Sequence, residues 1–176
     1  ALRDHENYDF QFGDMGDPGT LERALEDVSD VVILAGLVGD PICNMYPDEA
    51  ERINRESIRR AIRVVASSCV KSAIFISTCS NYGLIPESDR ASELYPLAPL
   101  SSYATAKVEA ERTFMDLMET GNVEKPVVLR FATAFGLSTR MRFDLTVNEF
   151  TREMFLGKHL QVFDPDTWRP YCHVGD

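Results

Sequence analysis

The sequence lacks several features that would assign it to a common class of protein. No apolar run approaches the length of a membrane span, and the amino terminus lacks the charged and then apolar order of a signal peptide. The four cysteines show no C-x-x-C spacing, so no metal site is expected, and scattered thiols fit the reducing cytoplasm. Basic residues are few: the chain has 18 of them against 28 acidic residues, which gives a net charge of -10. We therefore expect a cytoplasmic protein that binds neither nucleic acid nor a membrane.

Patterns typical of strands and of helices alternate along the chain. At 176 residues with 44% hydrophobic content, the chain can bury one good core. The expected strands are 8–12, 31–34, 72–77, 126–131 and 160–163. The expected helices are 18–27, 47–69 and 145–155, together with one that Ser101 or Ser102 caps and that runs to about Thr120. The proline-rich segment 86–99 is expected to be a loop. This order predicts an α/β fold with a doubly wound parallel sheet, covered by helices on both faces.

Tyr103 and Lys107 are the most informative residues of the chain. Four residues apart on a helix, they project from the same face. The ammonium favours the phenolate, which lowers the pKa of the phenol and makes it a general acid/base able to work near neutral pH. Upstream, the apolar strand 72–77 leads into the hydroxyl-rich run 77–80, at the carboxyl end where open α/β sheets bind their ligands. Together these features predict proton-transfer chemistry at that edge of the sheet.

Six segments follow one another in an order that is specific even though none of them is specific alone. They are Gly13-Asp14, Leu34-Ala35-Gly36, Ser77 to Gly83, Tyr103 to Lys107, Leu129 to Gly136, and Arg169 to Val174. In this order they resemble the extended short-chain dehydrogenase/reductases of the NAD-dependent epimerase/dehydratase family, which act on nucleotide sugars. The resemblance covers essentially the whole chain and implies a Rossmann-like fold.

The resemblance also implies a role for each matching residue. It makes Thr78, Tyr103 and Lys107 catalytic, with the Tyr103 phenolate taking the proton of a sugar hydroxyl while hydride leaves the same carbon for the nicotinamide ring. The implied cofactor is NAD, with NADP left open, and the implied cofactor-binding residues are Asp14, Met15, Leu34, Ala35, Gly36, Asn54, Ser77, Tyr103 and Lys107. The implied contacts to a nucleotide-sugar substrate are Thr78, Cys79, Ser80, Thr133 and Arg169. Family members commonly form homodimers through the catalytic helix, where Ala106, Ala110, Phe114 and Met118 are either that interface or ordinary core.

Three positions depart from the family pattern. Dehydratases carry an Asp-Glu pair directly after the strand-end threonine, where this chain has Cys79 and Ser80, so a 4,6-dehydratase is disfavoured. Cys79 as an acid/base is a weaker hypothesis, because the cysteine of related epimerases falls one residue later, where Ser80 stands. Thr133 replaces an asparagine that is common in the family. What remains favours a 4-epimerase or a ketosugar reductase.

The sequence also lacks the Gly-x-x-Gly-x-x-Gly turn that binds the pyrophosphate in this family. Most of the family's carboxyl-terminal substrate domain is missing too. We therefore expect an internal fragment, with a partial Rossmann-like domain over 1–136 and the start of a substrate-binding region over 137–176. Such a fragment is expected to be inactive on its own. The alternative is a truncated, non-catalytic module for nucleotide or protein binding, which would have no need of a polarised tyrosine.

Overall fold

The computed structural model describes residues 5–176 and divides the chain into two compact units. The first unit ends at Leu129 and the second begins at Arg130. Strand β3 (Lys125–Phe131) runs through this division.

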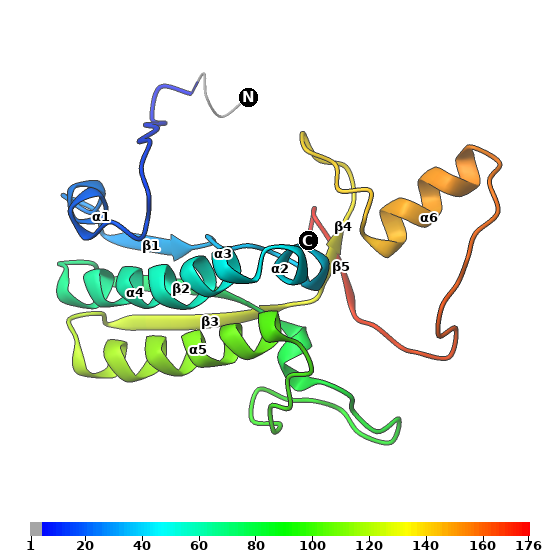
Figure 1. The fold of residues 1–176 in the computed structure, drawn as a ribbon. Coiled ribbons are helices and arrows are strands. Elements are labelled where there is room, and N and C mark those ends of the chain that lie inside the picture. The colour runs from blue at the N-terminus through cyan, green and yellow to red at the C-terminus, as the bar shows by residue number, and fades with distance from the viewer. Residues whose placement is uncertain (1–4) are drawn as a thin grey trace. The chain divides into compact units, whose positions relative to one another are not determined.

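The first unit contains a three-stranded sheet in the order β1-β2-β3 (Figure 1). Strand β1 (Asp30–Ile33) pairs in parallel with β2 (Ser72–Thr78), which places Asp30 opposite Ser72 and Ile33 opposite Phe75. Strand β3 is hydrogen-bonded to the other edge of β2. The prediction of an α/β fold built on a parallel sheet is confirmed.

The helices of the first unit are α1 (Pro18–Ala24), α2 (Asp40–Met45), α3 (Pro47–Glu51), α4 (Ile58–Ser67) and α5 (Ser102–Thr120). A π-helical segment, η2 (Arg52–Ser57), joins α3 to α4, so the predicted helix 47–69 forms as one stretch with a wide turn inside it. A 3-10 turn, η3 (Cys79–Tyr82), follows β2 directly. The Asp17 and Ser101 side chains accept hydrogen bonds from the amides of Thr20 and Ala104, which confirms the expected helix starts.

The core lies between the sheet and the helices α4 and α5, which run over one of its faces (Figure 1). Alternate residues of β2, including Ala73 and Phe75, point into it, and the Phe75 and Phe114 rings stack with centroids 5.8 Å apart. On the opposite face Val32 is 51% exposed and Val127 is 40% exposed. Among the described residues of this unit, helices therefore cover one face of the sheet, whereas the sequence pattern predicted cover on both faces.

The second unit contains a two-stranded parallel sheet and one helix. Strand β4 (Thr133–Phe135) pairs with β5 (Tyr171–His173), with Thr133 opposite Tyr171. Helix α6 (Thr146–Phe155) confirms the expected helix 145–155. Gly136 follows β4 at a φ of +121°, a backbone conformation that side chains disfavour, beside the ring of His173.

Two expected strands are wrong. Two segments, 8–12 and 160–163, have the apolar pattern of strands. Neither segment pairs with another strand among the described residues. Phe12 is 94% exposed and Phe163 is 76% exposed, so neither segment has a layer to pack against. A strand is stable only when a neighbour satisfies its backbone groups, which a local pattern does not supply. The short elements α2 and β4 were not expected.

Candidate functional site

Helix α5 places Tyr103 and Lys107 one turn apart beside the carboxyl end of β2. Ser101 caps this helix directly ahead of Tyr103, so the pair lies in its first two turns. Tyr103 is half-buried, whereas Lys107 is only 5% exposed. The structure thus brings together the strand end and the helix that the sequence pattern had linked.

The Lys107 ammonium is anchored to β2. Its Nζ atom donates a hydrogen bond to the Ile76 carbonyl at 2.9 Å and lies 4.8 Å from the centroid of the Phe75 ring. Burial lowers the pKa of Lys107 to about 8, and the nearby Glu111 carboxylate opposes this shift. The side chain therefore remains mostly a cation at neutral pH.

Thr78 is the last residue of β2 and caps η3. Its Oγ1 atom accepts a hydrogen bond from the Ser80 amide at 3.2 Å, which leaves the hydroxyl proton for another acceptor. Cys79 is half-buried and Ser80 is exposed. Ser77 is buried at 5% exposure, where its Oγ accepts a hydrogen bond from Asn81 rather than facing open space.

Asn54, on η2, supports the turn that follows β1. Its Oδ1 accepts from the Leu37 amide at 2.8 Å and its Nδ2 donates to the Leu37 carbonyl at 3.0 Å. Gly36 has a φ of +147°, and an added Cβ would meet Asn54 Oδ1 at 3.0 Å. The missing side chain at Gly36 therefore makes room for the Asn54 amide, which holds the turn in place. Leu34 and Ala35, before this glycine, are exposed.

We expect Asn54→Ala to lower the free energy of unfolding by about 2 kcal/mol, because the substitution removes the hydrogen bonds that Asn54 makes with both backbone groups of Leu37. Urea denaturation followed by circular dichroism measures the change. Asn44→Ala is the matched control, since Asn44 is exposed on the neighbouring α2. An equal loss in both variants would show that the bonds to Leu37 contribute nothing particular.

Asp14 and Met15 lie in the loop before α1. Asp14 accepts a hydrogen bond from the Gly16 amide at 2.8 Å, and its carboxylate lies 3.5 Å from the Arg52 guanidinium of η2. Met15 packs against the core. The loop 13–16 and the turn at Gly36 therefore both adjoin η2, which groups these predicted cofactor residues with Asn54.

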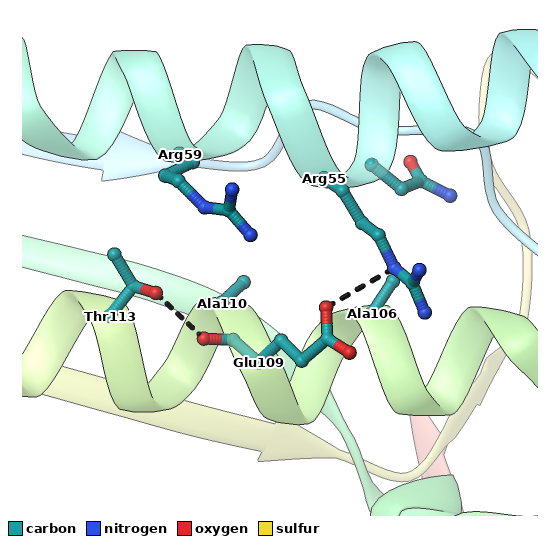
Figure 2. A pocket seen from close by; sticks show the side chains of 7 residues that line it. Arg55, Arg59, Ala106, Glu109, Ala110 and Thr113 are labelled. Carbon is teal, nitrogen blue, oxygen red and sulfur yellow. Dashed lines mark hydrogen bonds and ion pairs between the residues drawn. The ribbon is translucent and has the colours of Figure 1, made fainter.

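Helix α5 contacts η2 and α4 along another face (Figure 2). Arg55 reaches across to Glu109, with Nε 3.2 Å from the carboxylate. The enclosed space there has room for about one water molecule, so it is no ligand site. The alternative of core rather than dimer interface is correct for four residues of α5, which are at most 6% exposed within the single chain: Ala106, Ala110, Phe114 and Met118.

The remaining predicted substrate residues belong to the second unit. Thr133 begins β4 and donates its amide hydrogen to the Pro170 carbonyl at 3.2 Å. Arg169 is exposed, just before β5. Their roles in substrate binding stay predictions.

Asn81 and Glu111 are buried polar residues of the site that the sequence analysis missed. Asn81 Nδ2 donates to Glu111 Oε1 at 2.7 Å. Glu111 follows Lys107 by four residues, and that spacing places both on one helix face. The described residues contain no group of histidine, cysteine and acidic side chains able to hold a metal ion, and among them no helix is long and apolar enough to cross a membrane.

Comparison with known proteins gives one family. The profile of the NAD dependent epimerase/dehydratase family matches residues 1–176. The chain is 25% identical over 169 residues to the N-acetyl-alpha-D-glucosaminyl-diphospho-ditrans,octacis-undecaprenol 4-epimerase of Escherichia coli O157:H7, covering 94% of this chain and 48% of that protein. It is 28% identical over 131 residues to the putative UDP-arabinose 4-epimerase 4 of Arabidopsis thaliana, covering 72% of this chain and 29% of that protein. The chain thus spans at most about half the length of these curated relatives.

Solved structures agree with this assignment. MoeE5 in complex with UDP-glucose and NAD superposes with a TM-score of 0.79 at 27% identity, covering 94% of this chain and 54% of that one. The UDP-glucuronic acid 4-epimerase of Bacillus cereus, in complex with UDP-glucuronic acid and NAD, has the same fold, with a TM-score of 0.85 at 23% identity, over 99% of this chain and 54% of that one. Since the family profile matches its whole length, this chain belongs to the NAD-dependent epimerase/dehydratase family.

Proposed function

We propose that this chain carries the catalytic residues of a nucleotide-sugar 4-epimerase that uses NAD. The observation that carries the proposal is the buried Lys107 ammonium, fixed at the carboxyl end of β2 one helical turn from Tyr103. Membership of the family and the 4-epimerases among the relatives support it. A ketosugar reductase with the same residues is the second candidate.

The residues present fit the cofactor. The turn at Gly36, a few residues after β1, is held in place by Asn54 through both backbone groups of Leu37. Lys107 supplies a positive charge at the end of β2. When bound, NAD provides the hydride acceptor.

Each catalytic side chain has a separate task in this proposal. Tyr103, as phenolate, accepts the proton of the C4 hydroxyl while hydride leaves the same carbon, and returns a proton when the ketone is reduced from the other face. Lys107 favours the phenolate through its charge. Thr78, whose Oγ1 already accepts from Ser80, uses its hydroxyl proton as a donor to the reacting oxygen.

The decisive assay incubates the protein with NAD and either UDP-glucose or UDP-glucuronic acid. An epimerase is expected to form the C4 epimer, visible by proton NMR, with no net change in absorbance at 340 nm, because the hydride returns to the sugar. A reductase would consume NADH or NADPH in step with a ketosugar substrate. Nucleotide binding without either reaction by the polypeptide from the complete gene would indicate the non-catalytic module.

The length of active protein is part of the proposal. The 176 residues contain no glycine-rich phosphate turn, so we propose that they do not turn over alone. The assay is therefore run on the 176-residue chain and on the polypeptide from the complete gene. Turnover by the 176-residue chain would refute the proposed inactivity of that chain and support the proposal of an enzyme. We also propose a homodimer, which sedimentation of the complete polypeptide tests.

A further inference from the structure

Helix α5 buries a carboxylate directly behind the catalytic pair. Tyr103, Lys107 and Glu111 follow one another at four-residue spacing, so three titratable side chains share one face of the helix. Glu111 is 5% exposed, as is Lys107. A buried ion is costly unless other groups pair with it and hydrogen-bond to it, so these two charges need partners that stabilise them.

Asn81 ties this carboxylate to the turn that carries Thr78. The Asn81 side chain is fully buried on η3, and its Nδ2 donates to Glu111 Oε1 at 2.7 Å and to Ser77 Oγ at 3.0 Å. Its Oδ1 has no hydrogen-bond partner among the described residues. Reversing the amide would turn that acceptor toward the carboxylate. The Asn81 amide is therefore oriented so that Nδ2 donates to the Glu111 carboxylate, although this leaves Oδ1 without a hydrogen bond from the described residues.

The surroundings of Lys107 leave Glu111 as its counter-charge. The ammonium contacts the Ile76 carbonyl and the Phe75 ring, and β2 has no titratable side chain. Burial lowers the pKa of Lys107, and Glu111 is the charge that raises it.

Other elements packed against α5 also carry titratable groups, and these have different surroundings. Arg55 of η2 pairs with Glu51 and Glu109. The arginines of α4 are exposed. Burial raises the pKa of the Cys43 thiol on α2, which keeps that group neutral. The turn η3 contributes Cys79 and Tyr82.

We propose that Glu111 is a positioning residue of the catalytic pair, whose carboxylate, held by Asn81, keeps the Lys107 ammonium charged beside Tyr103. The inference rests on the proposed function, because a charged lysine is what makes the tyrosine an effective base there. It adds a second layer to the site, which joins β2, η3 and α5 through buried side chains.

The test follows the protonation of Lys107 directly. The protein is labelled with 13C at lysine Cε, the Lys107 resonance is assigned from a Lys107→Arg variant, and its chemical shift is titrated with pH. The midpoint is expected at about 8 in the unaltered protein. It is expected to fall by about one unit in Glu111→Gln, because loss of the opposite charge favours the neutral amine. Glu109→Gln, a half-exposed carboxylate two residues away that pairs with Arg55, is the matched control and leaves the midpoint in place.

A second variant keeps the proposal testable if Glu111→Gln does not fold. Asn81→Val keeps the carboxylate but removes its donor, so the Lys107 midpoint is expected to fall by a smaller amount in the same direction. An unchanged midpoint in a folded Glu111→Gln protein overturns the proposal, as does an equal fall in Glu109→Gln. In the active enzyme, kcat/KM is expected to fall at alkaline pH, and the midpoint of that fall is expected to shift to lower pH together with the Lys107 midpoint. If no form shows turnover, the proposed function fails, while the NMR titration still decides the role of Glu111.

Discussion

Tyr103→Phe is expected to reduce turnover by about a thousandfold while leaving the binding of NAD and nucleotide sugar nearly unchanged. The substitution removes one oxygen from a half-buried ring, so the helix and the Lys107 anchor to β2 remain. What is lost is the group that we propose takes the proton from the substrate hydroxyl. The measurement is kcat for C4 epimerisation in the complete polypeptide, together with the two dissociation constants by calorimetry.

Tyr95→Phe is the matched control for this experiment. Tyr95 lies in the loop 86–99, where it donates its hydroxyl proton to Asp89 at 2.8 Å and its ring packs edge-on against that of Tyr82 on η3. Removal of this hydroxyl is expected to change kcat by less than about twofold, since the hydroxyl bonds Asp89 and the ring that packs against Tyr82 is kept. Full turnover in Tyr103→Phe would remove the tyrosine from the chemistry and leave the fold as the main likeness to the family.

Phe114→Ala is expected to lower the free energy of unfolding by about 4 kcal/mol. Phe114 is fully buried on α5 and stacks on Phe75 of β2, so its removal leaves a cavity at the centre of the first unit. Because unfolding free energies of small domains are themselves about 5–15 kcal/mol, this one change is expected to remove much of the margin. Urea denaturation followed at 222 nm measures it, since α4 and α5 are the long helices of the unit.

Phe12→Ala provides the comparison in the same unit. Phe12 is 94% exposed, so its truncation is expected to change stability by less than about 0.5 kcal/mol. A loss in Phe114→Ala no larger than in Phe12→Ala would mean that the α5–β2 contact does not support the unit in solution.

The parts of the fold that sequence predicted well are those whose pattern continues for several turns. Residues of α4 such as Ile58, Ile62 and Val65 recur at helical spacing, and all three are buried where that spacing places them. The strand 72–77 combines apolar residues with a turn glycine at Gly83, and β2 forms there. The segment 8–12 has the same local alternation without a neighbouring strand, and whether a strand has a partner is a property of the tertiary structure.

The site was predicted less completely than the fold. Tyr103 and Lys107 are visible in the sequence because their spacing has a chemical meaning by itself. Glu111 repeats that spacing, but its contact with Asn81 joins residues 30 positions apart and depends on how η3 meets α5. Asn54 was named for the cofactor, and the structure shows its side chain bonded to the backbone of Leu37. Long-range polar pairs of this kind depend on tertiary geometry that a single sequence does not state.

The wide turn η2 affects how the protein responds when a residue is deleted from this helical stretch. A π-helical turn accommodates more residues than an α-helical one, and such turns occur often at functional sites. Deleting one residue, such as the exposed Glu56, would convert the stretch to regular α-helix while α3 and α4 kept their facing, because the wide turn is what absorbs the extra residue. Ile58 and Ile62 would keep their places in the core, whereas Asn54, inside the wide turn, would lose the position from which it bonds Leu37. Homologous chains that differ here by one residue are therefore expected to hold the turn after β1 by other means.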